Sequence, residues 1–166
     1  MPDHDVAALL VRLREDPSLL ERVQRLSDTS QPASAALLTP IDAVRVFEPL
    51  LAGQATEHFA VAALDRRCRL LAASVLTRGS DSATVVDPRQ VFAWALRQGR
   101  SGAHAIMVAH NHPSGDPTPS QEDVSVTHRL AAAGRVLGIA VTDHLVLADG
   151  PHGTVWSSLR QEGVLA

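Results

Sequence analysis

Four polar side chains between residues 110 and 123 are of the types that bind a metal ion and use it. His110 and His112 lie two residues apart, and Ser120 and Asp123 follow them. A catalytic zinc site usually takes three nitrogen or oxygen ligands from the protein and keeps one position for water. The sequence therefore predicts a Zn²⁺ site with His110, His112 and Asp123 as ligands and Ser120 beside them.

The local sequence allows these side chains to meet. Side chains at i and i+2 of an extended chain point the same way, and Pro113 keeps His112 extended because a residue before proline avoids the helical region. The turn-forming residues that follow let the chain fold back. Ser120 is a good N-cap, and Asp123 would then occupy N3 in the first turn of a helix, facing the histidines.

A simpler interpretation of these residues stays open. Ser120-x-x-Asp123 resembles a capping box, so Asp123 could serve only the helix, although Glu or Gln is usual at its position. Two histidines in a chain that has eight could be a surface pair. Spacing alone leaves metal binding as a hypothesis that depends on structural context.

The histidine pair, the serine and the aspartate resemble the JAMM (MPN+) metalloprotease motif: H-x-H, seven residues, S, two residues, D. The surrounding HNHPSGDPTPSQED, with Thr127 and Asp143-His144-Leu145 after it, resembles the bacterial RadC-type branch of that family, over roughly residues 40 to 166. The resemblance implies that the two histidines and the aspartate bind zinc and that the serine assists the oxyanion. It also implies that a glutamate on an early strand is the general acid/base.

Glu57-His58-Phe59 matches the segment in which the resemblance places that glutamate. Glu57 would open the first predicted strand, where a carboxylate that only needed solvent has little reason to lie. Zinc lowers the pKa of its water to about 7, and a nearby carboxylate can take the proton and pass it to a leaving group. A charged strand end is the alternative interpretation of Glu57.

Other polar residues are expected to have supporting roles. Asp143-His144 could lie behind a ligand histidine, whose other ring nitrogen commonly needs a partner, or could be hydrogen-bonded within a strand. Asp116 is expected to form a turn, and Glu122 to point about 100° away from Asp123 around the helix. The remaining histidines that lack partner spacing are expected in solvent: His4, His104, His128 and His152.

Composition limits the class of protein. A hydrophobic content of 45% supports a proper core, and with 3% aromatics that core must be built from Leu, Val and Ala. The net charge of −3 argues against tight, non-specific nucleic-acid binding. The single cysteine, Cys68, excludes an internal disulfide and favours a reducing cytoplasm. No apolar run approaches the ~18 residues of a membrane helix, so no membrane partner is expected.

The chain divides into two parts. Residues 1–36 are predicted to form a helical N-terminal extension and linker, with short amphipathic helices at 5–13 and 19–26, and residues 37–166 form the main domain. The N-terminal helices either pack on the main domain or contact another copy of the chain, so a homo-oligomer is one of the expected arrangements.

Periodicity and capping signals in the main domain predict three helices and six strands. The helices are expected at 40–52, 88–99 and 121–137, and the strands at 57–64, 68–76, 84–86 (a short one), 103–109, 139–147 and 154–158. This order indicates an α/β fold, an α/β/α sandwich around a mixed sheet. It suits the JAB1/MPN (cytidine-deaminase-like) fold that the resemblance implies, with the site at the end of the strand before His110.

The predicted function is a zinc hydrolase of amide bonds, acting on a peptide or an isopeptide-linked protein, with Glu57 as general acid/base and Ser120 as oxyanion stabiliser. One alternative is a DNA-repair-associated nucleic-acid-binding protein. RadC-type proteins often carry a helix-hairpin-helix segment, but residues 1–38 contain no glycine at which such a hairpin could turn. Another alternative is a catalytically idle interaction module that keeps the fold. The resemblance implies, however, that inactive members of the family typically lose metal ligands.

Overall fold

The computed structural model describes residues 36–79, 86–99 and 102–165. Both predicted N-terminal helices, all but the last residue of the predicted linker, and all but the last residue of the short strand predicted at 84–86 lie outside these ranges. No helix among the described residues is long and apolar enough to cross a membrane. The elements in chain order are α3 (Pro40–Leu51), β1 (His58–Leu64), β2 (Leu70–Arg78), α4 (Pro88–Ala95), β3 (Ala105–His112), α5 (Gln121–Leu137), β4 (Ala140–Gly150) and β5 (Gly153–Ser158).

The five strands form one mixed sheet in the order β2-β1-β3-β4-β5. Only β3 and β4 run parallel, and the other neighbours are antiparallel. A parallel pair needs a long crossover, usually a helix, and α5 provides it. β3 is the central strand, between β1 and β4, and every residue of β1 is buried.

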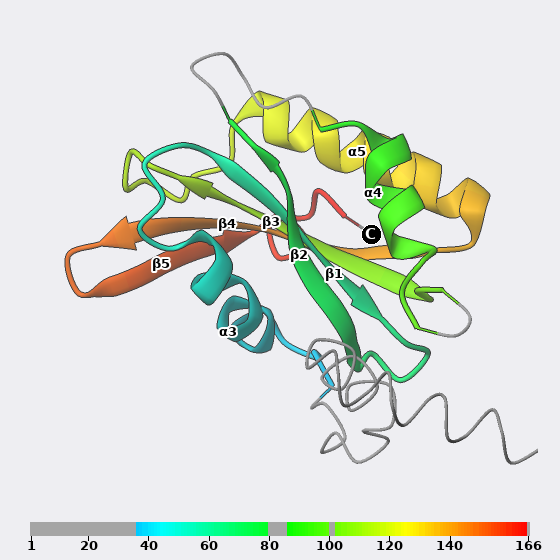
Figure 1. The fold of residues 1–166 in the computed structure, drawn as a ribbon. Coiled ribbons are helices and arrows are strands. Elements are labelled where there is room, and N and C mark those ends of the chain that lie inside the picture. Colours follow the sequence, from blue (N-terminus) through cyan, green and yellow to red (C-terminus); the bar gives the residue numbers. More distant parts are fainter. Residues whose placement is uncertain (1–35, 80–85, 100–101, 166) are drawn as a thin grey trace, which may run out of the picture. The chain divides into compact units, whose positions relative to one another are not determined.

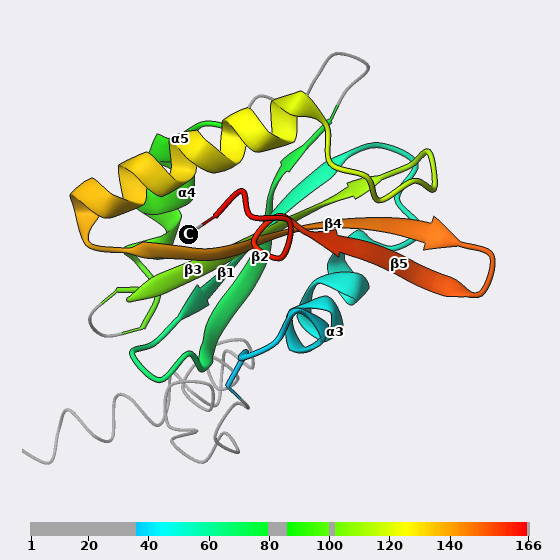
Figure 2. The same ribbon diagram turned by 180° about the vertical axis from the view of Figure 1, so that it is seen from behind.

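Helices cover both faces of the sheet, as Figures 1 and 2 show: α4 and α5 lie on one face and α3 on the other. Alternate side chains of the central strands supply the two cores. Val61, Ile106 and Val108 belong to the core under α4 and α5, whereas Ala62 and Met107 belong to the core under α3. The predicted α/β/α sandwich with a mixed sheet is confirmed.

The capping signals locate the helix ends. α5 begins at a capping box formed by Ser120 and Asp123, and α3 begins at a second one formed by Thr39 and Asp42. α5 ends at Gly138, whose φ of 69° lies in the left-handed region that glycine tolerates. The predicted range of α5 is therefore correct. α4 is shorter than predicted, because it ends at Ala95.

Candidate metal site

The two histidines lie at the end of β3. Pairing with β4 continues to His112, which lies opposite Ala148, so the strand stays extended beyond its apolar run. Strand alternation places His110 and His112 on the same face as Val108, the face covered by α5. His110 is buried, with 5% of its surface exposed, and His112 is half-buried.

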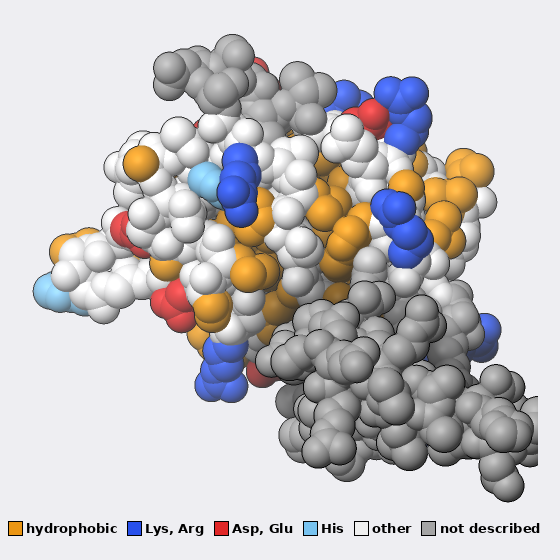
Figure 3. Space-filling model, in the orientation of Figure 1, with side chains coloured by type: hydrophobic (Ala, Val, Ile, Leu, Met, Phe, Trp, Pro, Cys, Tyr) orange, Lys and Arg blue, Asp and Glu red, His pale blue; other side chains and the backbone are white. Residues whose placement is uncertain are grey.

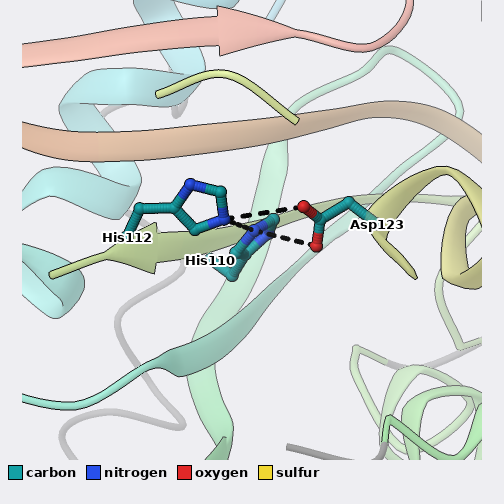
Figure 4. Close-up of side chains that lie close together, drawn as sticks. All are labelled: His110, His112 and Asp123. Carbon is teal, nitrogen blue, oxygen red and sulfur yellow. Dashed lines mark hydrogen bonds and ion pairs between the residues drawn. The ribbon is translucent and has the colours of Figure 1, made fainter. Parts of the chain in front are cut away.

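Asp123 reaches the histidines from the first turn of α5. Its Oδ1 lies 3.1 Å from His110 Nε2, and its Oδ2 lies 3.5 Å from His112 Nε2. Figure 4 shows the carboxylate facing both rings. One ligand atom from each of the three residues lies within 4.8 Å of the other two. Ser120 donates to Asp123 Oδ2 from both its backbone nitrogen and its hydroxyl, each at 2.7 Å.

The hydrogen-bond partner of His112 determines which ring nitrogen is free. Nδ1 lies 2.9 Å from the carbonyl oxygen of Asp116. A carbonyl oxygen only accepts, so Nδ1 carries the hydrogen and Nε2 of the neutral ring presents a lone pair. The loop reaches this position through a turn at Gly115, whose φ is 84°. Sequence reasoning expected Asp116 to form a turn, and its Oδ1 does accept the backbone N–H of Thr118 at 2.9 Å.

A longer hydrogen-bond chain sets the same tautomer in His110. The hydroxyl of Thr127 donates to the carbonyl oxygen of Asp123 at 2.6 Å, so it must accept from His144 Nδ1, also at 2.6 Å. Nε2 of the neutral His144 ring is then an acceptor, and it lies 2.9 Å from His110 Nδ1. His110 therefore donates from Nδ1 and presents its Nε2 lone pair to Asp123.

This donor set fits a metal cation. His110 Nε2 and His112 Nε2 lie 3.0 Å apart. Each carries a lone pair in the neutral form, and a carboxylate oxygen faces both. Lone pairs at this separation repel one another unless a cation lies among them. Two imidazole nitrogens and one carboxylate oxygen are also a ligand set that catalytic zinc takes.

The charges of the three residues are coupled. Burial raises the pKa of Asp123, but hydrogen bonds from the protonated forms of His110 and His112, and from Ser120, outweigh burial and hold that pKa well below its usual range. The hydrogen bond to Asp123 raises the pKa of His112, against the opposing effect of burial. His112 therefore keeps a proton to a higher pH than an ordinary histidine does, and that proton and a metal ion compete for the same ring nitrogen.

Burial keeps the pKa of His144 well below its ordinary value. The ring is fully enclosed and makes an edge contact with Phe59, with centroids 5.7 Å apart. A neutral His144 is the form that the hydrogen-bond chain through Thr127 requires. The electrostatics and the hydrogen bonding therefore agree on one protonation state.

Glu57 lines the same cavity as the histidines. The cavity has a volume of about 630 Å³, and its polar lining residues include Glu57, His110, His112, Ser120, Glu122, Asp123 and His144. Glu57 directly precedes β1, two residues before Phe59, which pairs with His110. Alternation from Phe59 therefore places Glu57 on the α5 face. The structure brings all five predicted site residues to one cavity.

The carboxylate of Asp143 binds the backbone of His144 and not its ring. Its Oδ1 accepts the backbone N–H groups of His144 at 2.7 Å and of Arg160 at 3.2 Å, and its Oδ2 accepts from Ser158 Oγ at 2.7 Å. Neighbouring residues of a strand point to opposite faces, so only His144 reaches His110. The part of the prediction that placed Asp143 behind a ligand histidine is wrong.

Two residues gained roles that sequence reasoning missed. Thr127 matched the resemblance but had no assigned contact, and it connects Asp123 to His144. Asn111 has no role predicted from the sequence; it points away from the metal ligands and binds the backbone at the start of β1. A partner more than fifty residues away leaves no signal in the local sequence.

Removing the hydroxyl of Thr127 is expected to lower zinc affinity by about 10–100-fold, the usual effect of losing a group behind a ligand histidine. Thr127→Val leaves the Nδ1–H of His144 without its acceptor, so His144 and His110 lose their fixed tautomers. Competition with a chromogenic chelator measures the affinity. Thr142→Val is the matched control, because it removes a hydroxyl that donates to the Ile106 carbonyl at 3.1 Å. Equal zinc affinities in the two variants would contradict a role for the hydrogen-bond chain from Thr127 through His144 to His110.

Comparison with known proteins finds relatives over most of this chain. A family model described as "RadC-like JAB domain" matches residues 37–164. The chain is 43% identical to a UPF0758 protein of Symbiobacterium thermophilum over 139 residues, 80% of this chain and 56% of the relative. It is 38% identical to a UPF0758 protein of Caldanaerobacter subterraneus, over 79% of this chain and 55% of the relative.

A UPF0758 protein of Methanosarcina mazei is also 38% identical, over 88% of this chain and 61% of the relative. The alignments therefore span 55% to 61% of the length of these curated relatives. The residues of this chain that the family model matches, 37–164, include the whole sheet and the histidine–aspartate cluster.

Proposed function

The chain belongs to the family of RadC-like JAB domains, and on that premise we propose that it is a zinc-dependent hydrolase of amide bonds in peptides or isopeptide-linked proteins. One observation carries the proposal. His110, His112 and Asp123 present three metal-ligand atoms within 4.8 Å of one another, in a cavity that Glu57 and Ser120 also line. Metal ligands, a carboxylate and a hydroxyl in one cavity are the groups that amide hydrolysis needs.

Each residue has a chemical role in this proposal. A zinc ion held by the two histidines and Asp123 would polarise a carbonyl group and acidify a water molecule. Glu57 accepts a proton from the water molecule while the water oxygen adds to the carbonyl carbon. It then delivers this proton to the amide nitrogen as the C–N bond breaks. The Ser120 hydroxyl donates to the carbonyl oxygen as that oxygen gains charge. To do so it turns away from Asp123, to which it donates in the structure.

The two alternative functions receive less support. On the face in Figure 3 the basic side chains stand in separate places, and those at the upper right adjoin an acidic side chain, so they form no continuous stripe that could follow a phosphate backbone. A catalytically idle interaction module does not need two neutral imidazole nitrogens and a charged carboxylate oxygen held close together. Hydrolysis accounts for the cluster, and the alternatives do not.

A peptide library tests the proposal without assuming a particular substrate. Zinc-loaded protein is incubated with proteome-derived peptides and with peptides joined through a lysine ε-amine, and new termini are identified by mass spectrometry. We expect cleavage products that disappear when a chelator removes the metal and return when zinc is restored. A protein that holds zinc and yields no products from either pool would count against the hydrolase.

A further inference from the structure

Main-chain pairing between β1 and β3 ends before it reaches Glu57, the proposed general acid/base. The last paired residues are Phe59 and His110. Glu57 lies beyond that point, in the segment of residues 52–57 that connects α3 to β1. Among the hydrogen bonds of the described residues, none involves the Glu57 carboxylate. Its position in the cavity therefore depends on how the backbone around it is held.

Beyond the last main-chain pair, the side chain of Asn111 connects β3 to the backbone around Glu57 by hydrogen bonds. Its Oδ1 accepts the backbone N–H of His58 at 2.8 Å, and its amide nitrogen donates to the carbonyls of Thr56 at 3.1 Å and Gln54 at 3.4 Å. These partners fix the orientation of the amide group, because an N–H can only donate and a carbonyl can only accept. Asn111 is 5% exposed, so no solvent competes strongly for these bonds.

The other side of the segment is held by β2. The backbone N–H of Gly79 donates to the carbonyl oxygen of Glu57 at 2.6 Å. The residues on either side of Glu57 are therefore bound by Asn111, and Glu57 itself is bound by Gly79. The backbone is clamped from both neighbouring strands, while the carboxylate stays free to contact substrate and water.

Asn111 lies between the two histidines in the sequence but on the opposite face of β3. Alternation directs His110 and His112 towards α5, whereas Asn111 shares the α3 face with Met107 and Ala109. It cannot reach the cluster of metal ligands. One strand thus carries the ligands on one face and the clamp for Glu57 on the other, so the position of the carboxylate is tied directly to that of the ligands.

We infer that Asn111 is a positioning residue that holds Glu57 over the His110–His112–Asp123 cluster, an inference that rests on the proposed hydrolase function. A general base must lie within hydrogen-bond reach of the proton it takes. A displacement of about 1 Å can lower a rate by about 100-fold. Asn111→Ala is therefore expected to lower kcat by about 100-fold, with zinc affinity unchanged.

Amide hydrogen exchange tests the clamp without a substrate. In Asn111→Ala the backbone N–H of His58 loses its acceptor, and we expect it to exchange about tenfold faster, in line with the loss of one hydrogen bond. The N–H of Gly79 reports the other side of the clamp and should keep its protection. Unchanged exchange at His58 would overturn the clamp whatever the protein hydrolyses.

A double-mutant cycle then tests whether the clamp acts through Glu57. If it does, Asn111→Ala lowers kcat in the wild-type background but not in Glu57→Gln, which has already lost the positioned group. Equal losses in both backgrounds, or lost zinc affinity, would assign Asn111 a general structural role. Thr142→Val controls for the loss of a side-chain bond elsewhere in the sheet.

Asn111→Thr provides a second variant if the alanine protein does not fold. A β-branched residue suits a strand, but its hydroxyl is too short to replace both ends of the amide, so the same loss of kcat is expected. Wild-type kcat in this variant would overturn the inference. A wild-type protein without hydrolysis removes the proposed function, whereas a failed cycle in an active protein removes only the positioning role.

Discussion

Replacing Glu57 with glutamine is expected to lower kcat by about 10²–10⁴-fold, the usual contribution of general acid–base catalysis, while zinc still binds. Glutamine has nearly the same shape as glutamate but cannot accept a proton from water. Glu57 lines the cavity without belonging to the cluster of ligand atoms, so its loss should leave that cluster intact. Steady-state kinetics and elemental analysis of the same preparation measure the two effects together.

Glu122→Gln is the matched control for this experiment. Glu122 is a second exposed carboxylate that lines the same cavity, and its substitution changes the net charge of the cavity by the same amount. We expect nearly wild-type kcat in this variant. Full activity in Glu57→Gln with zinc bound would remove Glu57 from the mechanism. Equal losses of kcat in Glu57→Gln and Glu122→Gln would mean that Glu57 acts only through its negative charge.

Replacing Asp123 with asparagine is expected to lower zinc affinity by more than about 100-fold, because the loss of a group that only supports a ligand already lowers affinity by about 10–100-fold. Asparagine keeps the side-chain shape and one oxygen, but it loses the charge that faces both histidines. Hydrolysis should fall with the metal at any zinc concentration below the new dissociation constant. Chelator competition measures the affinity.

The chain contains its own control for the capping role of Asp123. Thr39 and Asp42 form the same capping box at the start of α3, and both side-chain oxygens of Asp42 are occupied within that helix turn and by Arg45. Asp42→Asn should reproduce any loss of helix stability that Asp123→Asn causes through the cap, with no loss of zinc. If both variants lose stability equally and neither loses zinc, Asp123 is only a helix cap.

The sequence correctly predicted the features of the site that depend on a few neighbouring residues. Ser120 and Gly138 mark the ends of α5 as expected, because N-caps and left-handed C-caps depend on single residues. The expected capping box and the expected metal ligand are the same residue: Asp123 binds the N-terminus of α5 and faces the histidines. The two interpretations that the sequence left open are therefore compatible.

Contacts that depend on strand register could not be predicted. His144 reaches His110 because β3 and β4 run parallel with Val108 opposite His144, and nothing near either residue encodes that register. The predicted strand ended at Ala109 because the apolar run ends there, whereas pairing with β4 extends β3 to His112. The helix predicted at 88–99 ends at Ala95, and Leu96, which helical periodicity would have placed on its buried side, has 53% of its surface exposed.

Zinc content with coordination analysis tests the central claim most directly. The protein is purified without a histidine tag, equilibrated with buffered zinc, and examined by elemental analysis and by X-ray absorption at the zinc edge. We predict one zinc per chain, bound by two imidazole nitrogens and otherwise by oxygen. Folded protein that holds no zinc, or zinc bound through the sulfur of Cys68, would contradict a metal site at His110, His112 and Asp123.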